Sequence, residues 1–263
     1  MRFLQNGLKG REPLAIDPHR AADAKTLADK YAFSDIIAKL LGDRPQAYVR
    51  NDGIGVIPID GVIGRGISPL ESMLGAADID TISETIDAFE ADPAVKKIAF
   101  RVNSPGGTVT GVPELASKIR RMSKPTMAYG EEANSAALWI ASAADKFTAL
   151  PSGSIGSVGV YMVIPDFSQA YADAGVRMVV IKSKQSPLKG AGIEGTSLTE
   201  AQIADLQAQV DGIDEDFMAS VRMTRTNVSQ DAFTGGTFSG KQAARLGLVT
   251  GLADSFEEAL RSF

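Results

Sequence analysis

Short apolar runs alternate with longer segments of helical spacing along most of this chain. Residues 54–59 form an apolar run that ends at an Asp-Gly turn, and residues 97–103 alternate apolar and polar side chains, so both are predicted strands. Between them Ile79, Ile82 and Ile86 recur at helical spacing, and Asp92 before a proline ends that predicted helix. The same reasoning predicts further strands at 126–130, 147–149, 158–163 and 176–182 and further helices at 112–122, from Ser135, at 167–173 and at 200–225.

The alternation of strand and helix with short links predicts an α/β fold around a largely parallel sheet. The longest predicted helix, 200–225, begins at a capping box formed by Thr199 and Gln202 and keeps one apolar stripe. The first part of the chain has a different pattern, with helical spacing over 21–41 and Gly42 as its C-cap. We therefore expect an N-terminal helical arm over 1–47, either a lid or a clasp on a neighbouring subunit, and one domain over 48–263.

Composition excludes several classes of function. The 263 residues include no cysteine and one histidine, so thiol chemistry and a transition-metal site are not expected, and we expect no cofactor. The formal charge of −5 argues against a nucleic-acid partner. No apolar span approaches the length of a transmembrane helix, and the N-terminus lacks the apolar core of a signal peptide, so the expectation is a cytoplasmic protein without a membrane anchor.

Ser135 stands immediately before a run of alanines in the segment Ala133-Asn-Ser-Ala-Ala137, at the start of a predicted helix. A serine hydroxyl is a weak nucleophile until a neighbouring base removes its proton. The single histidine, His19, lies in the atypical first segment, so a lysine is the better candidate for that base. A lysine can act so only when a dry site without a carboxylate partner holds its amine neutral.

Three lysines lie in one segment of the predicted domain: Lys182, Lys184 and Lys189. Among them only Lys189 has glycine neighbours that would let a substrate backbone pass closely, although a solvated loop lysine remains the ordinary interpretation. Gly106 and Gly107 follow the predicted strand 97–103 in a loop, where their N–H groups could stabilise an oxyanion or form an ordinary turn. The stretch Gly235–Lys241 almost matches a phosphate-binding loop, but Gln242 replaces the required Ser or Thr, so we predict no nucleotide site.

Four motifs together resemble the signal-peptide-peptidase family of serine proteases, in the Clp protease and crotonase superfamily. They occur in the family's order and are Asn103-Ser-Pro-Gly-Gly107, Ala133-Asn-Ser-Ala-Ala137, Gly156-Ser-Val-Gly-Val160 and Gly235–Thr250. The resemblance covers about residues 50–255 and implies a fold of repeated β-β-α units. It departs from the family where Ala136 and Ala137 replace glycines.

The resemblance implies a Ser–Lys dyad with Ser135 as nucleophile. Counting back from Leu198-Thr199 places the base at Lys189, with Lys184 as the reserve candidate. Gly106, Gly107 and the backbone N–H of Ala136 correspond to the oxyanion hole, and Ser157 to a hydroxyl that orients the lysine.

The family also implies protein or peptide substrates and a homo-oligomer whose active sites combine residues of adjacent subunits. Soluble relatives include proteases that trim phage head proteins. The expected function is a serine endopeptidase whose substrate binds extended, as a strand beside residues 106–110, with a small or apolar residue before the cleaved bond. Two alternatives remain at this point: an acyl-CoA hydratase or isomerase of the same superfamily, and an assembly protein with a decayed site.

Overall fold

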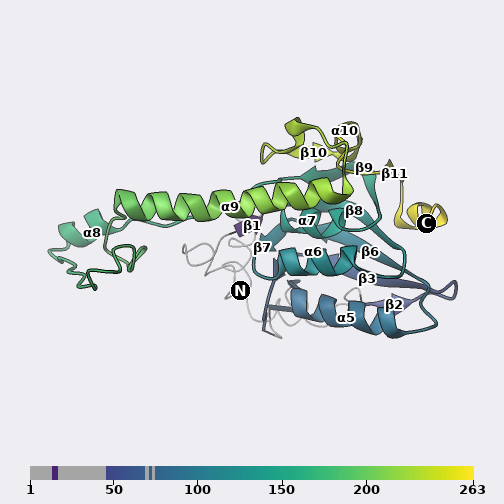
Figure 1. The fold of residues 1–263 in the computed structure, drawn as a ribbon, viewed down its shortest axis with the longest axis horizontal. Helices are drawn as coiled ribbons and strands as arrows, with labels where there is room; N and C mark the ends of the chain where they lie inside the picture. Colours follow the sequence, from purple (N-terminus) through teal and green to yellow (C-terminus); the bar gives the residue numbers. More distant parts are fainter. Residues whose placement is uncertain (1–13, 17–45, 69–70, 73–74) are drawn as a thin grey trace, which may run out of the picture.

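The main sheet of the computed structural model has a parallel centre, with antiparallel strands at its edges (Figure 1). The structure describes residues 14–16, 46–68, 71–72 and 75–263. The sheet order is β10-β9-β8-β6-β3-β2, and β11 pairs with β9. Its strands are β2 (Tyr48–Val49), β3 (Ile54–Asp60), β6 (Lys97–Ser104), β8 (Thr126–Asn134), β9 (Lys146–Gly156), β10 (Thr237–Ser239) and β11 (Gly251–Leu252). Strands β3, β6, β8 and β9 are parallel neighbours, which confirms the predicted α/β fold with a largely parallel sheet.

A second, smaller sheet forms beyond the carboxyl end of β6. Its order is β1-β7-β4-β5, with β1 (Leu14–Ile16), β7 (Gly106–Thr108), β4 (Ile63–Gly64) and β5 (Ala77–Asp78). The prediction that 103–107 is only a loop was therefore wrong, because the glycines belong to β7. A glycine pair allows this pairing, since a Cβ at Gly107 would lie 1.8 Å from the carbonyl oxygen of Ile63 on the neighbouring β4.

Helices cover one face of the main sheet and shield the larger core. They are α5 (Ile79–Ala91), α6 (Val112–Arg120), α7 (Ala136–Ser142), the C-terminal part of α9 (Glu200–Thr224), the short helix η1 (Gln230–Ala232) and α10 (Gly240–Arg245). Helix α7 is buried along its whole length, which explains why its sequence is apolar without an amphipathic pattern. The predicted helices at 79–92, 112–122 and 200–225 are confirmed, including the capping box of Thr199 and Gln202.

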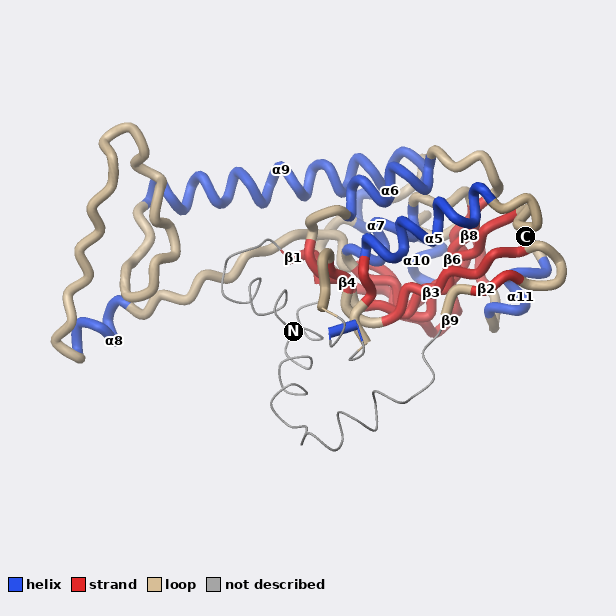
Figure 2. Tube along the Cα trace, turned by 90° about the horizontal axis from the view of Figure 1, so that it is seen from below, coloured by secondary structure: helices blue, strands red, loops and turns tan. Residues whose placement is uncertain are grey.

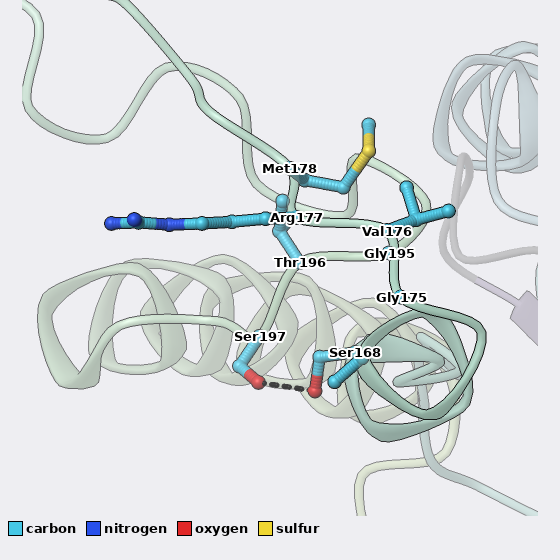
Figure 3. A pocket seen from close by; sticks show the side chains of 9 residues that line it. Ser168, Gly175, Val176, Arg177, Met178, Gly195, Thr196 and Ser197 are labelled. Atoms are coloured by element: carbon cyan, nitrogen blue, oxygen red, sulfur yellow. Dashed lines mark hydrogen bonds between the residues drawn. The ribbon is translucent and has the colours of Figure 1, made fainter.

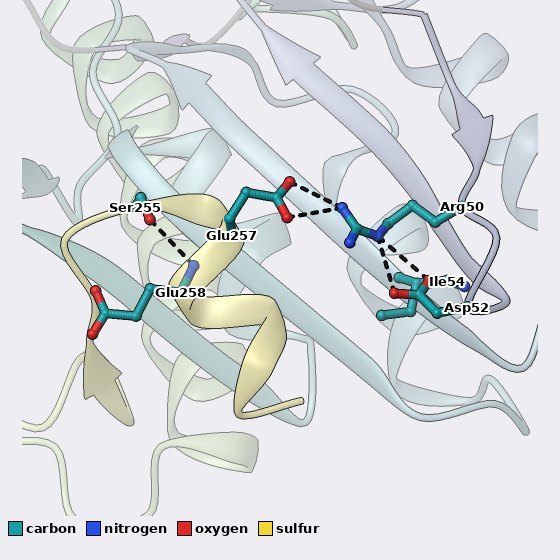
Figure 4. A network of polar contacts seen from close by, with 6 residues as sticks. All are labelled: Arg50, Asp52, Ile54, Ser255, Glu257 and Glu258. Atoms are coloured by element: carbon teal, nitrogen blue, oxygen red, sulfur yellow. Dashed lines mark hydrogen bonds and ion pairs between the residues drawn. The ribbon is translucent and has the colours of Figure 1, made fainter.

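The opposite face of the sheet is covered by α11 (Phe256–Arg261), whose Phe256 packs near Tyr129 of β8. Figure 4 shows how the edge of the sheet holds this helix: the guanidinium of Arg50 donates to the carboxylates of Asp52 and Glu257 at 3.2 and 2.9 Å. The contact joins the turn after β2 to a helix about 200 residues later.

Residues 164–209, which we call the extension, project away from both sheets. They contain α8 (Ser168–Asp173), a long connecting segment and the N-terminal part of α9, and Figures 1 and 2 both show them extending from one end of the molecule. The predicted strand 176–182 is wrong, because this segment has no strand neighbour in the described chain and lies exposed. Ile181 is 93% exposed and Val179 72% exposed.

Two other expectations changed. The predicted strand 147–149 is the start of the longer β9, which continues to Gly156, whereas the predicted strand 158–163 is absent from the described structure. The predicted helix 21–41 and His19 lie outside the described residues. Within the described residues, no helix is both long and apolar enough to cross a membrane.

Candidate active site

Ser135 occupies a strained turn between β8 and α7. Its backbone has φ 52° and ψ −120°, a conformation that residues with a side chain rarely adopt. The turn is held on both sides: the N–H of Ser135 donates to the carbonyl of Gly156 at 2.8 Å, and its carbonyl accepts from the N–H of Trp139 at 2.9 Å. A serine on a tight strand-to-helix turn is the arrangement that presents a nucleophile at the mouth of a helix, and strain of this kind concentrates at functional sites.

The hydroxyl of Ser135 is free of strong partners but enclosed. Its Oγ lies 3.5 Å from the carbonyl oxygen of Gly159, at the limit of a hydrogen bond, and the residue is 1% exposed. Because Ser135 precedes the first turn of α7, the positive end of the helix dipole favours negative charge beside it. The position therefore stabilises a negatively charged oxygen, such as an alkoxide or an oxyanion, more than it stabilises a neutral hydroxyl.

Ser157 also has a positive φ, at the end of the neighbouring strand. It follows β9 as Ser135 follows β8, has φ 54°, and is 5% exposed. Its N–H donates to the carbonyl of Gly236 at 2.7 Å. Since Asn134 pairs with Gly156, the structure brings the two serines to the ends of adjacent parallel strands.

The predicted oxyanion residues lie at the same edge of the sheet. Ser104 of β6 pairs with Ala133 of β8, so the chain that leaves β6 reaches Gly106 and Gly107 beside the entrance to α7, and β7 packs on that helix. Ala136 is the first residue of α7, where a backbone N–H has no partner within the helix.

Ser104 has a role that the sequence analysis missed. Its buried Oγ accepts the N–H of Gly106 at 3.2 Å, which fixes the turn into β7 and occupies one of the predicted oxyanion donors. A serine two residues before a glycine is the signal that could have indicated this turn.

Asn134 was also missed, although it precedes Ser135. Its amide nitrogen donates to Oγ of Ser154 at 3.0 Å, whereas its Oδ1 is buried and has no hydrogen-bond partner among the described residues. Because a buried acceptor without a partner is costly, this oxygen calls for an explanation such as a bound donor.

Lys189 is not brought to Ser135 within one chain. Both Lys189 and Lys184 lie exposed in the extension. Lys189 follows Leu188, whose carbonyl accepts a hydrogen bond from Nε2 of Gln202, in the first turn of α9, at 3.1 Å. Ser135 lies at the other end, where Trp139 of α7 stacks on Phe217 of α9. Residues 202 and 217 are about 22 Å apart along the axis of α9. Ser135 lies about 6 Å from Trp139 along α7, so it can be closer to residue 202 than Trp139 is by no more than that length. The remaining gap exceeds the reach of a four-carbon side chain.

The C-terminal end of α9 clamps the C-terminal end of α7. The hydroxyl of Thr224 donates to the carbonyl of Ser142, and Nη2 of Arg225 donates to the carbonyl of Ala144 at 2.8 Å. Burial lowers the pKa of the Arg225 guanidinium to about 10, and the charge of Asp145 offsets this in part. The orientation of α7 is therefore fixed along its side by the stacking of Trp139 on Phe217 and at its C-terminal end by these hydrogen bonds.

Figure 3 shows a hollow in the extension, between α8 and the segment 175–178. It is lined by Ser168, Ala172, Gly175, Val176, Arg177, Met178, Gly195, Thr196 and Ser197, and the hydroxyls of Ser168 and Ser197 lie 2.8 Å apart at one side. This hollow is far from Ser135 and holds no pair of groups suited to acyl transfer.

In the part of the chain that the structure describes, no group of three or more His, Asp or Glu side chains could hold a metal ion. The near match to a phosphate-binding loop is accounted for by structure instead. Gln242, the residue that argues against nucleotide binding, forms a capping box with Ser239 at the start of α10.

Comparison with known proteins identifies the family. The model of peptidase family S49 matches residues 118–262, which is more than half of the chain and includes Ser135, Ser157 and Lys189. This chain belongs to peptidase family S49. The match begins after Gly106 and Gly107, so it does not include the glycine pair.

Two curated proteins and one solved structure are similar to this chain. The chain is 30% identical over 222 residues to the head-tail preconnector protein GP5 of Enterobacteria phage P21, covering 83% of this chain and 44% of that protein. It is 30% identical over 161 residues to Protease 4 of Haemophilus influenzae, covering 60% of this chain and 25% of that protein. The chain thus spans less than half the length of either relative. A membrane-bound stomatin-specific protease matches with a TM-score of 0.46 and 15% identity, over 81% of this chain and 85% of that one.

Proposed function

We propose that this protein is a serine endopeptidase in which Ser135 is the nucleophile and a lysine of the extension, Lys189, is the general base. The single observation that carries the proposal is the left-handed backbone of Ser135 between β8 and α7, because an L-residue is held in that conformation at a cost of about 1–3 kcal/mol. Membership of a peptidase family supports the same activity. An acyl-CoA enzyme has no use for a strained serine at the helix entrance.

The dyad forms between two copies of the chain. The gap of several helical turns between Lys189 and Ser135 supports a pair formed between copies, and the exposed apolar side chains of the extension support docking on a neighbour. The neighbouring copy's extension delivers the amine to a site where Ser135 and Ser157 are already buried. There the low polarity favours the neutral amine that a base needs.

The reaction is acyl transfer followed by hydrolysis. The lysine amine takes the proton of Ser135 as Oγ attacks the peptide carbonyl, and the N–H groups of Gly107 and Ala136, with Gly106 once it is released from Ser104, stabilise the oxyanion. The lysine then protonates the leaving amine, and water hydrolyses the acyl-enzyme. Ser157 orients the lysine.

The substrates are extended segments of proteins. The similarity to a phage head-tail preconnector protein supports substrates among proteins of virion assembly. No cofactor takes part in these steps.

The first experiment tests Ser135. Ser135→Ala should abolish both the hydrolysis of casein and labelling by a fluorophosphonate probe, while thermal unfolding stays cooperative. A Ser135→Ala protein that digests casein at the parent's rate would falsify the assignment.

The second experiment tests whether the dyad spans two copies. Ser135→Ala and Lys189→Ala should each be inactive alone, yet an equal mixture that is dissociated and reassembled should regain about a quarter of the parental activity, since each site draws one residue from each of two copies at random. Lys184→Ala is the matched control and should remain active. A mixture that stays inactive, although sizing shows mixed oligomers, contradicts the shared site.

A further inference from the structure

Strand β1 lies on the strand that carries the candidate oxyanion glycines. Leu14, Ala15 and Ile16 pair antiparallel with Thr108, Gly107 and Gly106 of β7, although about 90 residues separate the two segments. Figures 1 and 2 both place β1 at the end of the molecule from which the extension leaves. A segment remote in sequence thus occupies the edge beside the site.

This edge of β7 is the place available to an extended substrate. The other edge pairs with β4, where Ile63 lies opposite Gly107 so closely that no side chain fits at that glycine. A peptide that adds a strand to β7 must therefore bind where β1 now lies.

The direction and register of β1 are those of the acyl side of a substrate. Because the pairing is antiparallel, the chain runs from Leu14, opposite Thr108, toward Ile16, opposite Gly106, the residue that adjoins the Ser104 turn. The residues opposite the two glycines are Ala15 and Ile16, one small and one apolar. Their carbonyl carbons are the ones that the register places nearest the proposed oxyanion donors.

We propose that the segment Leu14–Ile16 is a substrate of the protein's own site, and that the chain is cleaved after Ala15 or after Ile16. The inference rests on the proposed function and names its first substrate. Oγ of Ser135 attacks the carbonyl of that residue and the C–N bond breaks. The lysine returns the proton to the new amino terminus, and water releases the carboxylate from the serine ester. Until then β1 occupies the edge of β7 that another extended substrate would use.

The test follows the intact mass and amino terminus of the full chain after purification. The parent should accumulate a species that begins at residue 16 or 17, whereas Ser135→Ala should stay whole under the same conditions. A parent chain that retains residues 1–16 overturns the proposal, and so does a Ser135-dependent cut at any other bond.

A variant of β1 separates this inference from the proposed function. Ala15→Pro removes a backbone N–H and restricts the strand, so it should release β7 without providing a good cleavage site. We expect Ala15→Pro to remain full length, to react with fluorophosphonate, and to hydrolyse casein several-fold faster than parent protein that has not yet been processed. If Ala15→Pro and the parent are equally active and both stay whole, the self-substrate role is refuted and the peptidase stands. If neither reacts, the proposed function itself fails.

A peptide with the sequence of residues 11–20 provides an independent readout. Carrying a fluorophore and a quencher, it should be cut by the processed parent at the same bond as the chain, at least tenfold faster than a scrambled peptide. Equal rates for the two peptides would show that the register of β1 does not reflect recognition.

Discussion

The junction between α7 and α9 is predicted to carry a large share of the stability of the site. The ring of Phe217 is completely buried and stacks on Trp139, with centroids 4.4 Å apart and planes 5° from parallel. Phe217→Ala should lower the free energy of unfolding by about 3–5 kcal/mol, the usual cost of removing a buried aromatic ring. About 0.5–1.5 kcal/mol of that would be the lost stacking.

The assay is urea unfolding followed by tryptophan fluorescence, because Trp139 is the only tryptophan and reports on this junction. Working in a Ser135→Ala background prevents self-digestion from distorting the comparison. With about 2–4 °C of melting temperature per kcal/mol for a domain of this size, the thermal midpoint should fall by roughly 6–20 °C.

Met223→Ala is the matched control, since Met223 lies on the same helix near the same end but is 65% exposed. An exposed substitution of this kind should change the free energy by no more than about 0.5 kcal/mol. If the two variants lose similar stability, or if Phe217→Ala loses less than about 1 kcal/mol, the junction does not couple the two helices as described.

Three further outcomes are expected. Gly107→Ala should abolish peptidase activity and lower stability, because its Cβ would lie 1.8 Å from the Ile63 carbonyl oxygen. The control Gly212→Ala, whose Cβ meets nothing within 4 Å, should stabilise α9 by up to about 1 kcal/mol. An active Gly107→Ala protein would contradict the close approach of β7 to β4. Thr199→Ala should weaken the first turn of α9 by about 1 kcal/mol and speed hydrogen exchange at the amides of Gln202 and Ile203, while Ser239→Ala, which removes the equivalent cap of α10, should leave those two amides unchanged. Burial lowers the pKa of Arg225 to about 10, so above that pH the unfolded chain binds more protons than the folded one, and stability gains a contribution that rises with pH. Arg225→Met should lack this contribution, and identical pH slopes in the two proteins would refute it.

Local pattern determined most of the elements. The apolar spacing of Ile79, Ile82 and Ile86 and the Thr199–Gln202 cap needed no distant partner to be interpreted, because helix periodicity and caps are properties of a few neighbouring residues. The order of four short motifs similarly indicated the family and singled out Ser135 and the glycine pair.

Tertiary structure decided what depends on distant neighbours. Residues 176–182 have the composition of a strand yet lie exposed, because a strand exists only where another strand supplies its hydrogen bonds. The apolar stripe of α9 is continuous in sequence, but only its C-terminal part meets the core, while Ile203 at the other end is 53% exposed. The left-handed turn at Ser135, the separation of Lys189 from it, and the placement of Leu14–Ile16 on β7 all result from packing between segments far apart in the chain, which no local pattern encodes.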